Sequence, residues 1–221
     1  SKLAAVNILY RVGARNENPA RTGFAHLFEH LMFRGTRAVE NFDLPVQMAS
    51  GDNNAFTNND YTDFYITLPK DNLETALWLE SDRMEGLDIT PEKLETEKRV
   101  VIEEFRQRYL NQPYGDQTML LRALAYKVHP YRWAAIGLAT DHIAGATLAD
   151  VESFYRAHYR PSNAILSISA DMEEERMLEL AEKWFAPLAD HPSETAAIPQ
   201  EPVQTQARRQ EVERDVPAST V

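Results

Sequence analysis

The sequence predicts an α+β fold in which helices pack on one face of a largely antiparallel sheet, as a two-layer αβ sandwich. Three observations lead to this fold class. Apolar residues alternate from 4 to 12, which is the period of a half-buried strand. Several stretches between 71 and 185 have the longer period of amphipathic helices. Two further predicted strands follow each other too closely for a helical crossover, so we expect them to pair antiparallel.

The predicted elements can be placed in order along the chain. Strands are expected at 4–12, 53–57, 61–68 and 164–170, and helices at 24–33, 71–85, 91–109, 115–128, 148–159 and 173–185. A polar run, Asn58-Asn59-Asp60, predicts the turn between the second and third strands. Thr90 and Pro91 predict the N-cap and first turn of the longest helix. Thr147-x-x-Asp150 predicts a capping box before the helix that ends near 159.

Composition sets the domain organisation. The chain has 221 residues, of which 43% are hydrophobic, and this is enough material for a sizeable core. After residue 187 the composition shifts to Pro, Gln, Glu and Thr. We therefore expect residues 1–190 to form one domain and residues 191–221 to be an exposed linker with the start of a following domain.

Charge and residue usage exclude several classes of protein. The formal net charge of −11 argues against nucleic acid as a partner, because its phosphates would be repelled. The chain has no cysteine, so a metal would have to be held by His and carboxylate side chains. Since no run approaches 18 apolar residues, we expect a soluble chain without a membrane span. The compartment stays open, with bacterial periplasm and cytoplasm equally compatible with a chain that lacks cysteine.

One face of the helix predicted at 24–33 carries His26, Glu29 and His30. At about 100° per residue the three lie within about 100° of arc, opposite the apolar stripe of the helix. The two imidazoles can reach one ion, and the carboxylate stands beside them without having to ligate. Zinc suits two neutral imidazoles and one carboxylate, with a fourth position for a water whose proton Glu29 can take. The alternative is a surface helix that carries these three residues by chance.

A third ligand can come from the helix predicted at 91–109. Glu97 and Glu104 share one edge of its apolar stripe, two turns apart, whereas Glu103 points to solvent. A carboxylate at the rim of a buried stripe is costly unless something pairs with it. Zinc would satisfy Glu104, and Glu97 could orient a ligand. The alternative is that these carboxylates pair with basic side chains of the same helix, such as Lys98 or Arg108.

Two stretches of the chain resemble a known family. Residues 21–36, RTGFAHLFEHLMFRGT, closely resemble the signature of the pitrilysin–insulysin family of zinc peptidases, which includes mitochondrial processing peptidase. Residues 97–104, EKRVVIEE, are similar to the second motif of that family. The resemblance implies that His26, His30 and Glu104 bind Zn²⁺ and that Glu29 is the catalytic base. It also implies that Glu97 orients a ligand.

The resemblance extends over most of the chain and has implications for substrate and partners. Residues 51–57, GDNNAFT, are similar to the edge strand on which the family binds its substrate. Asn54 and Ala55 would then bind the backbone of an extended peptide as an added strand, and Phe56 would help to line a side-chain pocket. Without the family, we would interpret this stretch as an ordinary hairpin strand.

The family also implies parts of the site that this chain does not contain. Its members have at least two homologous domains, and an Arg and a Tyr from the C-terminal half complete the site. We expect the first strand of the fold to precede residue 1. The leading hypothesis is therefore a bacterial-type zinc metalloendopeptidase domain that needs a second domain or subunit. The alternatives are a non-catalytic partner or scaffold subunit and a module that binds peptides without cutting them.

Overall fold

The sheet of this protein has four strands in the order β2-β3-β1-β4, and every neighbouring pair is antiparallel. The structure is a computed structural model that describes residues 1–190 and 197–215. The strands are β1 (Leu3–Tyr10), β2 (Asp52–Thr57), β3 (Thr62–Pro69) and β4 (Ala164–Ser169). The four predicted strands are therefore confirmed to within two residues at each end.

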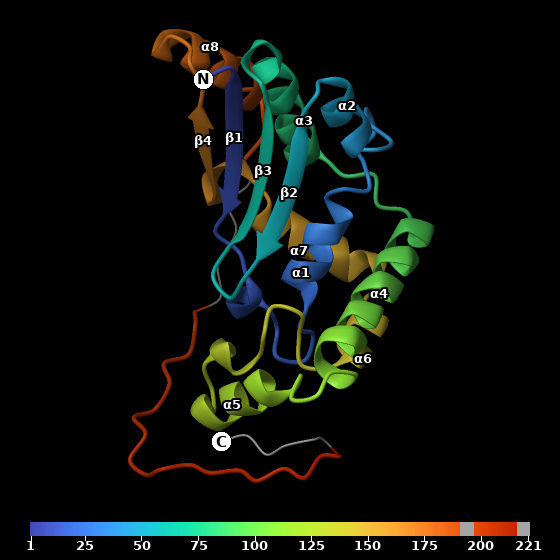
Figure 1. Cartoon of the computed structure of the whole chain (residues 1–221), viewed down its shortest axis with the longest axis vertical. Coiled ribbons are helices and arrows are strands. Elements are labelled where there is room, and N and C mark those ends of the chain that lie inside the picture. Colours follow the sequence, from blue (N-terminus) through green and yellow to red (C-terminus); the bar gives the residue numbers. More distant parts are fainter. Residues whose placement is uncertain (191–196, 216–221) are drawn as a thin grey trace.

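Helices cover one face of the sheet, as the fold class predicts (Figure 1). The α-helices are α1 (Phe24–Leu31), α2 (Asp43–Met48), α3 (Leu73–Glu85), α4 (Pro91–Phe105), α5 (Gln117–Ala125), α6 (Thr140–Ala144), α7 (Leu148–His158) and α8 (Glu174–Phe185). A π-helix, Arg106–Leu110, extends α4, and short 3-10 turns lie at Ala14–Asn16, Lys70–Asn72, Pro130–Arg132 and Pro161–Asn163.

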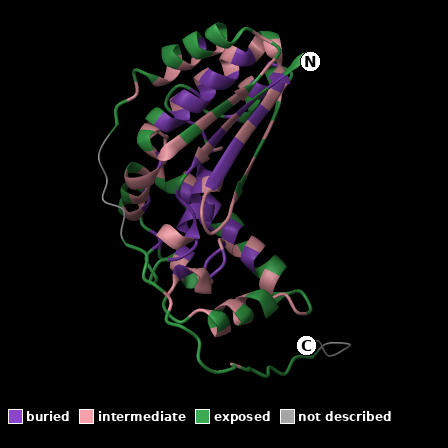
Figure 2. Ribbon diagram, turned by 90° about the vertical axis from the view of Figure 1, so that its left-hand side faces the viewer, coloured by how far each residue is buried: buried purple, intermediate pink, exposed green. Residues whose placement is uncertain are grey.

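Burial along the strands explains why the sheet is covered on one side. Ala4, Val6, Ile8 and Tyr10 of β1 are buried and alternate with less buried residues, as the period of two predicts. One core cluster joins this face to α1, α4 and α7, and a second joins it to α2, α3 and α8. Figure 2 shows the buried residues gathered between the strands and these helices.

Local signals for turns and caps are confirmed. The side chain of Asn58 accepts hydrogen bonds from the backbone N–H groups of Asp60 (2.7 Å) and Tyr61 (3.0 Å), which closes the turn between β2 and β3. The Thr90 side chain accepts from the Lys93 N–H at the start of α4. The capping box of Thr147 at the start of α7 is also present.

Two predicted helices differ from the structure by more than two residues at one end. The helix predicted at 115–128 is shorter, because α5 ends at Ala125 and Tyr126 is already extended. The helix predicted at 91–109 changes to π-helix after Phe105. Helices α2 and α6 were not predicted, since five or six residues are too few to show a helical period.

The predicted linker is tied to the domain where the structure describes it. Residues 197–215 form no helix or strand, yet the Glu201 carboxylate accepts the backbone N–H groups of residues 127–129 at 2.7–2.9 Å. The Arg208 side chain donates to two carbonyls at the end of α5, at 2.8 and 2.9 Å. Residues 191–196 and 216–221 lie outside the described residues, so the domain boundary at 190 stays a prediction.

Candidate metal centre

Helix α1 is held at its N-terminus by a buried carboxylate, Glu17. Its Oε2 accepts the Gly23 N–H and its Oε1 accepts the Ala25 N–H, both at 2.9 Å, and the Trp133 indole N–H donates to Oε2 at 3.1 Å. The carboxyl oxygens pair with N–H groups at the helix start that have no partner within the helix, and burial raises the pKa of Glu17 to about 8. Gly23 has φ +90°, and a Cβ there would lie 2.7 Å from the Ile136 carbonyl oxygen, so glycine is required where the chain enters α1.

The two faces of α1 have the characters that the sequence predicts. Leu27, Phe28 and Leu31 are at most 1% exposed and pack in the core, which leaves the face of His26, Glu29 and His30 directed away from it. Because the apolar face is fixed by burial, the three polar side chains are presented together. The rotation of α1 is thus set by its own sequence.

Helix α4 brings a carboxylate to the two imidazoles. His30 Nε2 lies 3.4 Å from Glu104 Oε2, and His26 Nε2 lies 3.7 Å from the same oxygen. One possible ligand atom from each of the three residues lies within 4.8 Å of the others, and this is the only such group among the described residues. Ligand atoms about 2.05 Å from a tetrahedral zinc would lie about 3.3 Å apart, so the three residues fit a zinc ion.

The neighbouring acids of α4 differ in their surroundings. Glu103 is exposed and pairs with Arg106 at 3.7 Å, which agrees with the prediction that it points to solvent. Glu104 also pairs with Arg108, Nη1 to Oε1, at 2.8 Å. The alternative interpretation, in which Glu104 pairs with a basic side chain such as Arg108, is therefore met for this one pair. The pair uses Oε1, whereas Oε2 faces the histidines.

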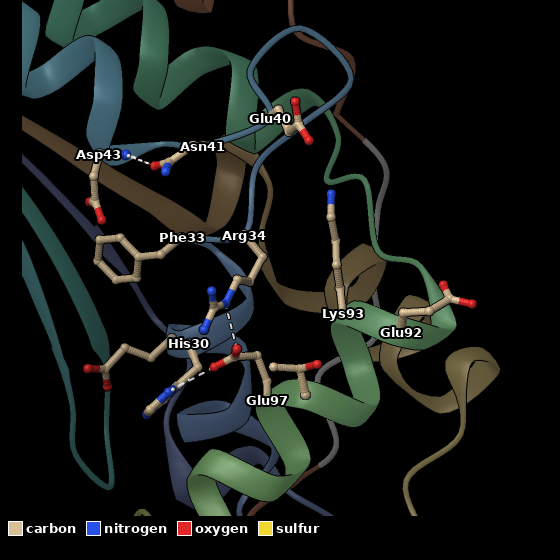
Figure 3. A pocket seen from close by; sticks show the side chains of 11 residues that line it. His30, Phe33, Arg34, Glu40, Asn41, Asp43, Glu92, Lys93 and Glu97 are labelled. Carbon is tan, nitrogen blue, oxygen red and sulfur yellow. Dashed lines mark hydrogen bonds and ion pairs between the residues drawn. The ribbon is translucent and has the colours of Figure 1, made fainter.

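Glu97 lies behind His30, away from the ligand group. Its Oε2 is 3.2 Å from His30 Nδ1, and its Oε1 accepts a hydrogen bond from Arg34 Nε at 2.5 Å (Figure 3). The Glu97 side chain is only 2% exposed. A carboxylate at Nδ1 fixes the orientation of an imidazole and leaves Nε2 for a metal, which is the arrangement typical of metal sites in proteins.

The protonation of the two histidines reflects this environment. Burial, reinforced by the charge of His30, lowers the pKa of His26 to about 4. Burial also acts to lower the pKa of His30, but hydrogen bonds to Glu104 and Glu97 outweigh it and raise that pKa to about 9. His30 therefore holds a proton among carboxylates, a position from which a metal cation would displace it.

Glu29 lies beside the three possible metal ligands but is not one of them. Its Oε2 is buried and has no hydrogen-bond partner within residues 1–190 and 197–215. Burial raises the pKa of Glu29, although Thr57 and His30 act in the opposite direction. Glu29 and His30 line a cavity of about 560 Å³, together with Phe33 and Arg34. A carboxylate with a raised pKa in a cavity can accept a proton from a bound molecule.

Strand β2 forms an edge of the sheet, as the resemblance implies. The Ala55 N–H donates to the Asn54 side-chain oxygen at 2.8 Å, so it is directed away from β3. Phe56 is 45% exposed and packs edge-to-face on Tyr61, with 5.8 Å between the ring centroids. An N–H group on an exposed edge can pair with an added strand.

The sequence analysis assigned no role to several residues at this site. Arg34 could have been predicted from its spacing, because it follows His30 by four residues and would lie on the same side of a continued helix. Thr57 lies at the end of β2 and acts on Glu29 only across the fold. Glu17 lies in a loop before α1 and lacks any periodic signal, so its role is visible only in the structure.

Comparison with known proteins identifies the relatives of this chain. Residues 1–134 match the insulinase family, peptidase family M16, and residues 145–220 match the domain described as the peptidase M16 inactive domain. The chain is 35% identical to a zinc protease, PqqE, of Helicobacter pylori over 95% of this chain and 48% of that protein. It is 24% identical to a probable mitochondrial-processing peptidase subunit beta of Arabidopsis thaliana, over 90% of this chain and 37% of that protein.

A solved structure, a protease from Helicobacter pylori, superposes with a TM-score of 0.86 at 35% identity and covers 94% of this chain and 51% of that one. The chain thus spans about half the length, or less, of the relatives that it matches. Among the described residues, no helix is long and apolar enough to cross a membrane. From its family match and its fold, this chain belongs to the insulinase family of peptidases, family M16.

Proposed function

We propose that this chain is the metal-binding half of a zinc endopeptidase that hydrolyses extended peptides. The observation that carries the proposal is the convergence of His26, His30 and Glu104 on one point, with the free oxygen of Glu29 beside them. Relatives named zinc proteases support a peptidase function and a zinc cofactor. His26, His30 and Glu104 would hold the ion, and Glu97 would orient His30.

Zinc bound to these residues would polarise the peptide carbonyl and acidify a water molecule. Glu29 accepts the proton of the attacking water and then delivers it to the leaving amine. Its raised pKa suits both steps, since the carboxylate takes a proton more readily than an exposed glutamate does. Thr57, at the end of β2, forms a hydrogen bond with Glu29 that acts to lower the carboxylate's pKa and limits the rise caused by burial.

Substrate would bind as an extended strand along β2. The Ala55 N–H, now bonded to the Asn54 side chain, is available to a peptide carbonyl once that side chain turns away. The Asn54 amide can then bind the peptide backbone in turn. Phe56 offers an exposed aromatic ring for a substrate side chain. Binding through backbone groups makes an extended peptide, rather than a folded protein, the natural substrate class.

A second homologous domain or subunit would complete the site. Helicobacter pylori PqqE is about twice as long as the stretch that matches this chain, and the Arabidopsis thaliana relative is named as a subunit. The second half would close over the cavity beside Glu29 and supply groups that stabilise the charge on the reacting carbonyl. We propose that this chain alone binds zinc but cleaves peptides poorly.

The decisive test is Glu29→Gln in the protein complete with its second half. We expect one equivalent of zinc to remain bound, because Glu29 is not a ligand, while peptide hydrolysis falls by about 10³-fold or more through loss of the general base. The matched control is Glu103→Gln, which removes an exposed carboxylate of α4 and should change neither quantity. Full activity of the Glu29→Gln protein would disprove the mechanism.

Zinc content separates the proposal from the scaffold alternative. Wild-type protein that holds less than a tenth of an equivalent of zinc after reconstitution would be a non-catalytic subunit. The exposed edge of β2 also favours a peptide-binding module as a second candidate. Wild-type protein that binds zinc and a fluorescent peptide but never cleaves a peptide library would support that candidate instead.

A further inference from the structure

We propose that Arg34 is a positioning residue that holds Glu97 in the orientation in which it directs His30 to the metal. The inference rests on the proposed zinc site and extends it by one residue. It assigns to Arg34 an effect on zinc affinity, although Arg34 does not reach the ligand group. Figure 3 shows Arg34 and His30 reaching the two oxygens of Glu97, one oxygen each.

The first step is the burial of Glu97. Its side chain is 2% exposed, so both oxygens need partners within the protein. His30 Nδ1 contacts Oε2 at 3.2 Å and Arg34 Nε contacts Oε1 at 2.5 Å. These are the side-chain contacts recorded for this carboxylate in the described part of the chain. The orientation of the carboxylate is therefore set jointly by the two residues.

The second step is the geometry of the segment that carries both partners. Helix α1 ends at Leu31, but the chain continues in tight turns, with the Phe33 N–H bonded to the His30 carbonyl and the Arg34 N–H to the Leu31 carbonyl. Arg34 therefore stays on the side of the chain that His30 occupies. Both side chains meet the same carboxylate, which comes from α4, and they join the two helices behind the metal site.

The third step is that the basic side chains of α4, and Arg108 in the π-helix that extends it, contact groups other than Glu97. Lys93 binds Asp88 at 2.8 Å, Lys98 binds Glu95 at 2.6 Å, and the guanidinium of Arg108 binds Glu104. The exposed Arg99 donates to the Glu95 carbonyl and the Thr96 hydroxyl, at 3.3 and 3.4 Å. Loss of Arg34 would leave the buried Oε1 of Glu97 without a charged partner, which is strongly unfavourable. The carboxylate would turn toward another donor or toward water, and His30 would lose its fixed orientation.

The consequence is a change in zinc affinity. Removal of the group that orients a metal-bound histidine lowers metal affinity by about 10- to 100-fold, and Arg34 acts through that group. We expect Arg34→Met to weaken zinc binding by about tenfold. Arg34→Lys keeps a cation within reach of Glu97 and should bind zinc within about threefold of wild type.

The experiment is a double-mutant cycle on zinc affinity, measured by competition with a chromophoric chelator. The proteins are wild type, Arg34→Met, Glu97→Gln and the double variant, with Arg37→Met as the matched control. Arg37 is an exposed arginine three residues further along, on a different cavity. If Arg34 acts through Glu97, its substitution has no further effect once Glu97 is glutamine.

Several results would overturn the inference. Equal zinc affinity of Arg34→Met and wild type would do so, as would a full additional loss in the Glu97→Gln background. A loss of equal size in Arg37→Met would show a general effect of charge. If Arg34→Met does not fold, a tenfold loss in the folded Arg34→Lys protein would count against the inference. Wild-type protein that binds no zinc would instead refute the proposed function, so the two failures are distinct.

Discussion

At the scale of single residues, the histidines have contrasting surroundings. His26 and His30 face carboxylates, whereas His142 accepts the Thr22 N–H at 3.1 Å and so has a structural role. His158, at the end of α7, packs on Phe154 with 4.6 Å between ring centroids. Neither His142 nor His158 forms an ion pair with a carboxylate in the described part of the chain, in contrast to His26 and His30.

His158 gives a prediction for the dependence of stability on pH. Burial, reinforced by the charge of Arg160, lowers its pKa from 6.5 to about 4. The folded state therefore binds the proton less tightly than the unfolded state. The stability that results is fully present above pH 6.5 and is lost as the pH falls toward 4.

We expect His158→Gln, which cannot titrate, to lose less stability on acidification than wild type. Between pH 7 and pH 4, the free energy of unfolding should fall by on the order of 2–3 kcal/mol more in wild type than in the variant. Urea unfolding at both pH values measures it, and carboxylates that titrate in both proteins cancel in the comparison. Parallel pH dependences would show that His158 is not buried in its neutral form.

At the scale of elements, β2 pairs with the sheet along one edge and leaves its other edge unpaired. Its inner edge pairs with β3 from Asp52 to Thr57, and its outer edge carries the Ala55 N–H. Residues 52, 54 and 56 are exposed while their neighbours are half-buried, so one side of the strand rests on the protein and the other is open. An edge of this kind can receive a peptide without any rearrangement of the sheet.

Ala55→Pro tests this function of the edge. Proline removes the outward N–H and leaves the pairing with β3 intact, since an edge strand tolerates proline where its N–H faces solvent. We expect KM for an extended peptide to rise by about tenfold, in line with the loss of one hydrogen bond to the substrate. Ala55→Ser, which keeps the N–H, is the control and should behave as wild type.

The measurement is steady-state kinetics with a fluorogenic peptide, together with the unfolding temperature of each variant. A proline variant with unchanged KM would show that the peptide does not bind along β2. A variant that lowers kcat alone, with KM unaltered, would place the defect in the chemical step instead.

At the scale of the whole molecule, the metal would join segments that are distant in sequence. His26 and His30 come from α1 and Glu104 from α4, and these helices lie side by side against the same core cluster (Figure 1). His26, His30, Glu97 and Glu104 lie together there, and an arginine contacts each of the two carboxylates. Zinc would displace the proton of His30 and link the two helices.

Zinc should therefore stabilise the fold. A ligand that binds only the native state, at a thousandfold excess over its Kd, contributes about 4 kcal/mol. We expect zinc to raise the unfolding temperature of this chain by several degrees and a chelator to reverse the rise. Glu104→Gln should abolish most of the shift. A shift of the same size in that variant would mean that zinc binds elsewhere on the protein.

Much of the fold could be predicted because its signals are local. Alternation in β1, the Thr90-Pro91 start of α4 and the Asn58 turn all depend on neighbours within a few residues, and all are confirmed. The early end of α5 and the short helices α2 and α6 depend on tertiary packing or are too short to show a period. Those elements were missed for that reason.

The sequence by itself determined which side chains share a face. On α1 the burial of Leu27, Phe28 and Leu31 turns the polar residues outward, and on α4 the apolar stripe separates Glu104 from the exposed Glu103. These relations hold because a helix has a fixed period, so spacing along the chain is direction in space. The resemblance to zinc peptidases depends on the same local pattern.

Only the tertiary structure decided how the two helices meet. Three features join residues that are far apart in the chain. They are the 3.4 Å distance between His30 and Glu104, the hydrogen bond from Arg34 to Glu97, and the position of β2 at the edge of the sheet. Such distances result from the packing of two apolar faces against one shared core, and no periodicity within a single segment specifies that packing.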